Sequence, residues 1–232
     1  MKFGVGLART WMLSPTAFKQ TWPSRPVASN RLRFEYGFGF GDRYHPYSEV
    51  LQMGSIREGA VLLEEFNLKF REFANSLSLG QCLPVQAWRF SLREIQRRSA
   101  GRVLSTHFGL PSEDLTKECQ QRVEKLWQLR DSLSANGFVP HSKNRIEGVL
   151  TQRGNVLVLG GQHRVPVMAQ LGWNVFPVLI WPRPNTPKRI VPQRLPLVRA
   201  GKLSLADAEA LTERIDRGFC RDDAISWGFP TA

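Results

Sequence analysis

A glycine pair followed by three hydrogen-bonding side chains is the segment of this sequence best suited to chemistry. It directly follows the apolar run Val156 to Leu159 and consists of Gly160, Gly161, Gln162, His163 and Arg164. Two glycines between a buried strand and a helix start let the backbone approach an anion closely, and the free N–H groups of that helix point at it. Arginine binds phosphate oxygens as a fork, and histidine adds a donor whose protonation responds to the anion. The segment therefore predicts a phosphate-binding turn.

A purely structural interpretation of the same side chains stays open. Arg164 would then pair with a carboxylate, and His163 would cap a turn without contacting any ligand. The position of both residues at a glycine turn that opens a helix favours the anion site.

The elements that must position this turn are a strand, a helix and a second strand. Val156 to Leu159 is uninterruptedly apolar, as in a strand buried on both faces. Gln162 to Leu171 predicts a helix in which Pro166 is tolerated near the first turn, and Gly172 ends it. Val175 to Trp181 predicts the second strand.

Outside this unit the pattern predicts three longer helical segments and several connections. Apolar side chains recur at helical spacing in residues 45–73, residues 111–136 predict a helix stopped by Gly137, and Ser204 starts a capped helix that Gly218 ends. Residues 31–41 alternate aromatics with glycines, which suits an extended strand or a close-packed loop. Residues 141–153 are polar and predict a connection. The fold class expected is α+β, a small mixed sheet with packed helices.

Composition indicates a folded protein with an affinity for polyanions. The chain has 232 residues, and 32 Lys and Arg against 20 Asp and Glu give a net charge of +12. Such a charge attracts nucleotides, nucleic acid or anionic surfaces. The three cysteines form no C-x-x-C pair, and no apolar run reaches the ~20 residues of a membrane span. We expect a cytoplasmic protein with no export signal.

Two further basic segments could contact anions. The arginines in residues 89–102 recur at mostly helical spacing, which suits a solvated helix face or an anion-binding one. After Trp181 the predicted contacts with anions or nucleic acid are Arg183, Lys188, Arg189 and Arg194. The four histidines show no short ligand spacing, so no metal site is predicted.

A family resemblance covers Leu129 to Ile180, about a quarter of the chain. The Gly-Gly-Gln-His-Arg turn, Ala169-Gln-Leu-Gly and Val175-Phe-Pro-Val-Leu-Ile resemble the ParB/sulfiredoxin fold, whose members carry Gly-x-His-Arg or Gly-Glu-Arg-Arg at this turn. His45-Pro-Tyr and Leu197-Val-Arg-Ala-Gly also resemble uncharacterised ParB-like proteins of bacterial surface-polysaccharide clusters. Residues 1–30 mix proline, serine and arginine without periodicity and predict a loosely ordered arm. Residues 31–110 are expected to form a mainly helical accessory region, and the resemblance implies a nucleotide-binding domain with a basic extension in 111–232.

The departures from the family pattern narrow the expected activity. Sulfiredoxins carry a catalytic cysteine where this chain has Gln162, so sulfinic-acid reduction is not expected. Only about fifty residues follow Trp181, mostly an extended basic stretch and one clear helix, which leaves no room for the helix-turn-helix domain of partition proteins. The related kinases need a carboxylate base, and Glu147 is the only acid between Asp131 and Asp207.

The resemblance therefore implies a protein that binds ATP or another nucleotide, with Mg²⁺, and transfers phosphate to a small hydroxylated acceptor. In that interpretation His163 and Glu147 are the candidate catalytic residues, although a surface glutamate in a connection is the alternative for Glu147. A non-enzymatic DNA-binding or adaptor module is the second hypothesis, based on the dispersed positive charge. A third is a scaffold in which the motif is structural.

Overall fold

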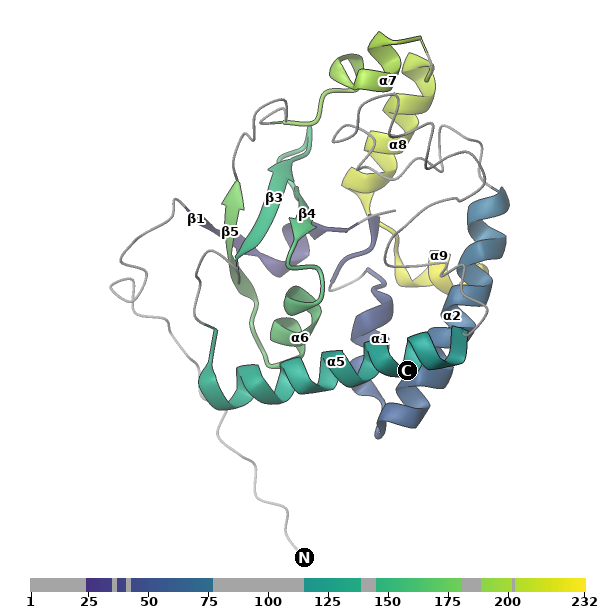
Figure 1. Ribbon diagram of the computed structural model, residues 1–232. Helices are drawn as coiled ribbons and strands as arrows, with labels where there is room; N and C mark the ends of the chain where they lie inside the picture. The colour runs from purple at the N-terminus through teal and green to yellow at the C-terminus, as the bar shows by residue number, and fades with distance from the viewer. Residues whose placement is uncertain are drawn as a thin grey trace, which may run out of the picture.

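The computed structural model describes a five-stranded mixed sheet with helices packed around it (Figure 1). The residues described are 24–34, 37–40, 43–76, 115–138, 145–180, 189–201 and 203–232. The strands are β1 (Ser24–Ala28), β2 (Leu32–Arg33), β3 (Ile146–Leu150), β4 (Val156–Gly160) and β5 (Val175–Ile180). Their order is β1-β5-β3-β4-β2; β1–β5 and β3–β4 are antiparallel, whereas β3–β5 and β2–β4 are parallel. The predicted α+β class with a mixed sheet is confirmed.

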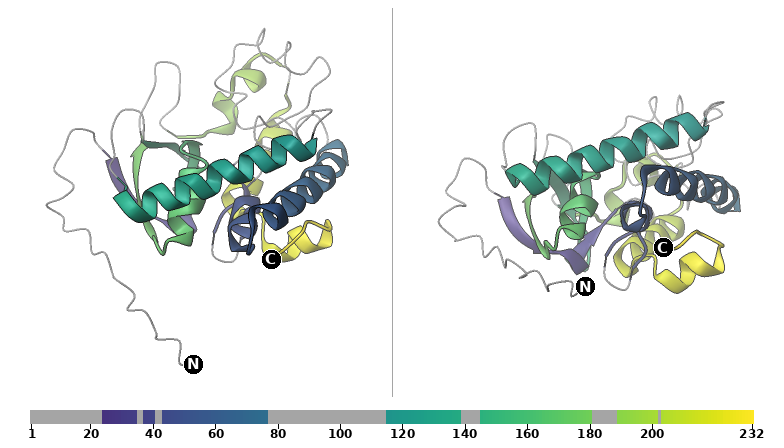
Figure 2. Two further views of the ribbon diagram at one scale, coloured as in Figure 1. Left: turned by 60° about the horizontal axis from the view of Figure 1, so that its bottom comes forward. Right: turned by 90° about the horizontal axis from the view of Figure 1, so that it is seen from below.

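Helices cover the sheet and one end of its strands. They are α1 (Pro46–Gln52), α2 (Ile56–Ser76), α5 (Leu115–Asn136), α6 (Arg164–Gln170), α7 (Pro196–Arg199), α8 (Leu205–Arg217) and α9 (Arg221–Ser226), with 3-10 turns η1 (Ser29–Arg31) and η4 (Pro192–Arg194). The long helix α5 passes α6 and packs against α2, as the turned views in Figure 2 show. One long helix thus connects the sheet's helical cover with the N-terminal helices.

The predicted strand, turn, helix and strand are all present as β4, α6 and β5. Within β4, Val156 and Val158 pack into the larger core, whereas Leu157 faces a second apolar cluster with α8, so the strand is buried on both faces. The helix is shorter than predicted and begins at Arg164, because Gln162 and His163 form the turn. The glycine after the helix, Gly172, adopts a φ of 87°, which favours glycine.

Residues 141–153 were predicted as a connection, and for residues 146–150 that prediction was wrong. They form β3, the central strand of the sheet, between β4 and β5. The polar Glu147 and the small Gly148 hide the strand pattern in the sequence. A side chain at Gly148 would bring its Cβ within 2.8 Å of the Leu157 carbonyl oxygen, so close strand packing requires the glycine.

The predicted N-terminal arm needs a similar correction for residues 24–28. They form β1, an edge strand in which Pro26 lies opposite Pro177 of β5. Proline is tolerated there because an edge strand leaves one row of N–H groups outside the ladder. With β2 on the opposite edge, the first described residues supply both edges of the sheet.

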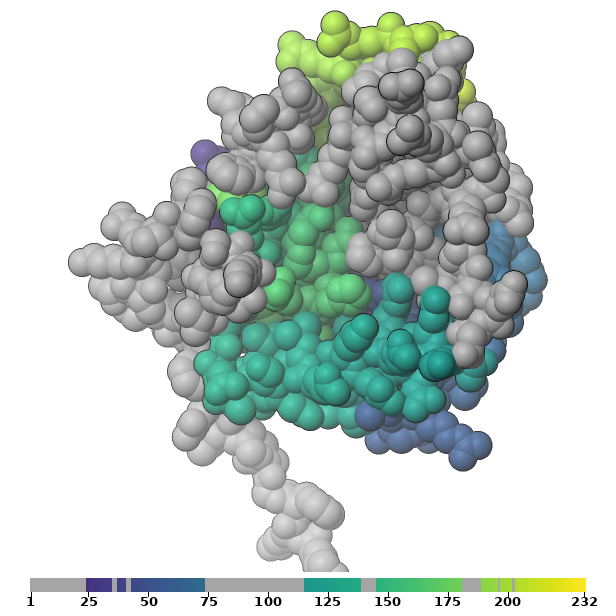
Figure 3. Space-filling view, in the orientation of Figure 1, coloured from purple at the N-terminus to yellow at the C-terminus, as the bar shows by residue number. Residues whose placement is uncertain are grey.

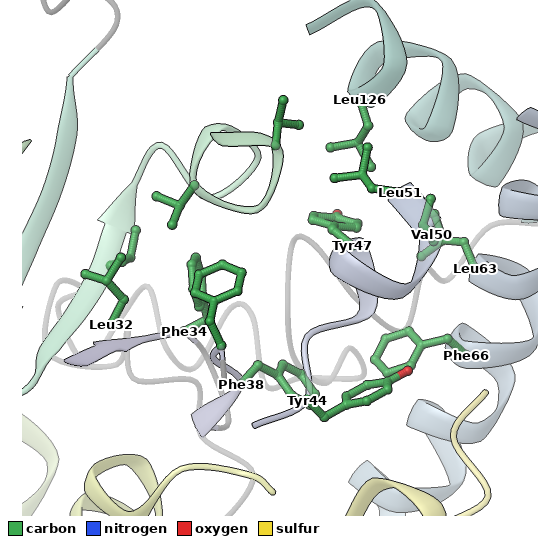
Figure 4. Close-up of a cluster of buried hydrophobic side chains, with 14 of the residues drawn as sticks. Leu32, Phe34, Phe38, Tyr44, Tyr47, Val50, Leu51, Leu63, Phe66 and Leu126 are labelled. Atoms are coloured by element: carbon green, nitrogen blue, oxygen red, sulfur yellow. The ribbon is translucent and has the colours of Figure 1, made fainter. Parts of the chain in front are cut away.

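A large aromatic core joins the N-terminal helices to the sheet and to the end of the chain. Figure 4 shows part of it, from Leu32 and Phe34 near the sheet to Phe66 on α2. Phe38 contacts the rings of Phe66 and Phe219 edge-on, with centroids 5.9 and 5.5 Å apart. The described parts of residues 31–110 and 111–232 therefore share one buried cluster.

The C-terminal segment contains more helix than the sequence predicted, and α8 is tied to the β3–β4 turn by one buried acid. α9 had not been predicted; it begins with a capping box formed by Cys220 and Asp223. On α8, Asp216 accepts hydrogen bonds from the Thr151 hydroxyl, from the Arg153 N–H at 3.2 Å and from the Asn155 amide at 3.2 Å. Three donors of one turn converge on a single carboxylate.

Replacing this carboxylate is expected to destabilise the fold. Asp216→Ala leaves three donors without their acceptor, so we expect a loss of about 2 to 3 kcal/mol in the free energy of unfolding, measured by urea denaturation. The control is Glu213→Ala on the same helix, which removes only an exposed ion pair with Arg153 and is expected to change stability little. Equal effects of the two substitutions would contradict a buried tie.

Candidate functional site

The turn between β4 and α6 is built on a glycine that no other residue replaces without strain. Gly161 has a φ of 83°, and a Cβ there would lie 3.1 Å from Ile146 Cγ1 and 3.3 Å from the Arg145 carbonyl oxygen. Both the left-handed backbone and the close approach of β3 therefore call for glycine. As a result the chain leaves β4 abruptly, and His163 and Arg164 line a pocket together with residues of α5.

A pocket of about 790 Å³ lies between this turn and α5. Its lining from β4 and α6 includes Leu159 and all five residues predicted to bind phosphate, Gly160, Gly161, Gln162, His163 and Arg164. Its lining from α5 consists of Glu118, Gln121, Arg122, Lys125, Leu126 and Leu129. Figure 3 shows this face, on which the surface of α5 lies directly below that of the β4–α6 segment.

Positive charge enters the pocket from both walls. Arg164 comes from the turn, and Arg122 and Lys125 come from α5, where their spacing puts them on one face of the helix. Burial lowers the pKa of Arg164. Glu118 is the one acid among the described lining residues. The two α5 cations were not predicted as site residues, because the pairing of α5 with the turn is a long-range contact.

The predicted backbone cradle is not formed by the first turn of α6. The N–H groups of Arg164 and Val165 both donate to the Gly161 carbonyl oxygen, at 2.9 and 3.1 Å, and Pro166 has no N–H. The expectation that free helix N–H groups point at an anion is therefore wrong for these three positions. An anion at this turn would therefore find no free N–H donor at these three positions.

His163 is a neutral imidazole at pH 7. Its pKa is lowered to about 4, first by burial and then by the charges of Arg122, Arg164 and Lys125. Its ring stacks on Tyr47 of α1, with centroids 5.2 Å apart and planes 23° apart. At pH 7 the imidazole can thus donate one hydrogen bond and accept another.

Gln162 and Glu147 lie on the inner side of the turn. The Gln162 side chain is buried, and its amide donates back to the Val158 carbonyl oxygen at 3.4 Å. Glu147, the predicted base, is buried on β3 opposite Gly160 and forms an ion pair with Arg145. A Cβ on Gly160 would lie 3.6 Å from Glu147 Oε2, which puts the carboxylate directly behind the glycine. Glu147 is therefore no surface glutamate of a loop.

Of the described basic residues after Trp181, Arg189 lies at the other end of the sheet from the turn. Arg189 forms a bridge with Leu150, which pairs with Val156 at the start of β4, whereas the pocket lies at the Gly160 end. Val156 and Gly160 are four residues apart along β4, which corresponds to about 13 Å in a strand. Arg194 follows on η4, and both arginines are exposed. Arg183, Lys188 and residues 89–102 lie outside the described residues, so the nucleic-acid prediction stays a prediction.

The described part of the chain contains neither a candidate metal cluster nor a candidate membrane-spanning helix. Its side chains include no group of three or more His, Cys, Asp and Glu that could hold a metal ion. None of its helices combines the length and apolar character needed to cross a membrane.

Comparisons of the chain with protein-family models, curated proteins and solved structures find no match. The resemblance to the ParB/sulfiredoxin fold therefore depends on the sequence pattern alone. Function has to be argued from the pocket and its chemistry.

A second buried histidine, His45, lies behind the site, and its low pKa makes the stability of the fold depend on pH. Its Nδ1 caps α1 by accepting the Tyr47 N–H at 3.2 Å, and its ring stacks on Phe40 with centroids 5.4 Å apart. Its pKa is lowered to about 3, first by burial and then by His163. Below about pH 6.5, the ordinary pKa of histidine, His45 becomes protonated in the unfolded chain but stays neutral in the folded one. Stability is thus lost as pH falls from about 6.5 toward 3.

We expect His45→Asn to make the protein less sensitive to acid. Asparagine is a good N-cap and does not titrate, so the cap is kept while the contribution of His45 to the proton linkage disappears and that of His163 remains. At pH 5 the linkage is worth about 2 kcal/mol, from 1.5 pKa units at 1.36 kcal/mol each. Urea denaturation at pH 7.5 and pH 5 measures it. If both proteins lose the same stability between these values, His45 is not the titrating group.

Proposed function

We propose that the pocket between α5 and the β4–α6 turn binds the phosphate groups of a nucleotide of the ATP type. The observation that carries this proposal is the convergence of three cations, Arg122, Lys125 and Arg164, from two separate elements on one glycine turn. Cations from two walls surround an anion, whereas a solvated helix face would present them in one direction only. The volume of about 790 Å³ is in the range of small-molecule sites.

The chemistry of the lining matches a ligand with a charged and an apolar part. The guanidinium groups of Arg122 and Arg164 can each bind two phosphate oxygens, and Lys125 adds a point charge. Leu126, Leu129 and Leu159 supply apolar surface for the nucleoside. Glu118 is the carboxylate in the lining that suits a magnesium ion accompanying the phosphates, since such an ion usually takes one or two protein carboxylates.

Calorimetric titration with ATP, ADP and CTP, with and without magnesium, tests the binding. We expect micromolar affinity, and at least about tenfold weaker binding after Arg164→Ala or Arg122→Gln, because each removes a charge-assisted pair with phosphate. Arg189→Ala is the matched control, since Arg189 is an exposed arginine at the far end of β3. Absence of binding to all three nucleotides, or equal loss in the control, would overturn the proposal.

The proposal extends to transfer of the terminal phosphate to a hydroxyl group. Glu147 would take the proton of the acceptor hydroxyl while the acceptor oxygen forms a bond to the γ-phosphorus and the bond to the ADP oxygen breaks. The cations of the pocket would stabilise the charge on the transferred group. The closeness of the Glu147 carboxylate to Gly160 supports this role.

Glu147→Gln is expected to abolish transfer while leaving nucleotide affinity within about threefold of wild type, because the amide keeps the size of the side chain but is no base. The assay follows formation of ADP from ATP over a panel of small hydroxylated compounds, serine and sugars among them. Glu118→Gln removes the carboxylate of the pocket lining instead, and its rate of ADP formation is compared with that of Glu147→Gln. If Glu147→Gln forms ADP as fast as wild type, Glu147 is not the base.

A further inference from the structure

Tyr47 touches the pocket from behind without lining it. The residue lies in the first turn of α1, and its side chain is 1% exposed. Figure 4 shows it on α1, below the part of α5 that carries Leu126. It belongs to a region for which the sequence offered no functional role.

Two contacts connect Tyr47 with opposite walls of the pocket. Its ring stacks on the imidazole of His163, which belongs to the β4–α6 turn. Its hydroxyl oxygen accepts a hydrogen bond from Arg122 Nη1 of α5 at 3.2 Å. One rigid side chain thus contacts a phosphate-site residue on each wall.

Tyr47 is itself held tightly by the aromatic core. Its N–H donates to His45 Nδ1 at the start of α1, and His45 packs against Phe34 and Phe40 with centroids 4.5 and 5.4 Å apart. A buried, close-packed ring has little freedom to move. The core therefore fixes the position of the Tyr47 ring, and this ring contacts residues on both walls of the pocket.

We propose that Tyr47 is a positioning residue of the anion site, which orients Arg122 through its hydroxyl and His163 through its ring. An arginine has a long flexible side chain, and ordering it on binding costs conformational entropy. An acceptor that already directs the guanidinium lowers that cost, so the hydroxyl strengthens binding without touching the ligand. This inference rests on the proposed function, because the oriented groups are those that would hold the phosphates.

The affinity test uses Tyr47→Phe in the full chain, with ADP and inorganic pyrophosphate as probes in calorimetry. Loss of the hydroxyl is expected to weaken both probes about five- to tenfold, since Arg122 loses a charge-assisted hydrogen bond. In the Arg122→Gln background the same change is expected to alter affinity less than about twofold, because the two residues act as one unit. Equal weakening in both backgrounds, or none in either, overturns the inference.

Tyr44→Phe is the matched control for a merely structural effect. Tyr44 is also fully buried, and its hydroxyl donates to the Pro230 carbonyl oxygen at 2.9 Å, on the C-terminal side of the core. Both substitutions are expected to lower the thermal midpoint. Only Tyr47→Phe is expected to weaken the probes, and equal weakening by Tyr44→Phe would reduce Tyr47 to a packing residue.

A second measurement needs no ligand and separates this inference from the proposed function. Proton NMR titration of the His163 imidazole is expected to give a pKa near 4 in the wild type, and a value at least one unit higher in Tyr47→Leu, because loss of the ring admits water. An unchanged pKa in that variant means that Tyr47 does not position His163. If the wild type binds neither probe, the proposed function fails, and Tyr47 then loses its role in binding whatever the titration gives.

Discussion

The backbone of Gly161 is the constraint on which the site depends. Its left-handed conformation turns the chain at the end of β4, and the absence of a side chain lets β3 pass within van der Waals distance. Both conditions follow from one residue, and together they set the direction in which His163 and Arg164 leave the sheet. The three-residue offset between strand end and helix start then puts these side chains opposite α5 rather than against the sheet.

Local patterns were sufficient to predict this unit but not its surroundings. The strand, the turn, the helix and the second strand are contiguous in sequence, and their signals are an apolar run, two glycines and a helix-ending glycine. β3 escaped detection because its close packing requires Gly148 and it carries a buried Glu147, which both weaken an apolar pattern. β1 escaped because an edge strand tolerates Pro26, which sequence reasoning takes as evidence against a strand.

The larger omission in the site was its second wall. Arg122 and Lys125 are ordinary helical cations in sequence, and nothing local distinguishes them from a solvated face. They become part of a site because α5 packs against both α6 and α2. The contacts of Tyr47 were equally unpredicted, since they bridge about 75 residues to Arg122 and more than one hundred to His163. Pairings of this kind depend on tertiary packing, which spacing along the chain does not encode.

The lowered pKa of His163 reflects the positive charge that lines the pocket. Arg122, Arg164 and Lys125 all lower the pKa of the imidazole, so their charges act on His163 in the same direction. Like charges held together in a partly buried space repel one another, and this repulsion opposes folding. An anion bound there would relieve the repulsion among the cations and remove the main charge effect on His163. In the proposed function the same cluster would favour negatively charged ligands, and the phosphate chain of a nucleotide carries more of that charge than a carboxylate does.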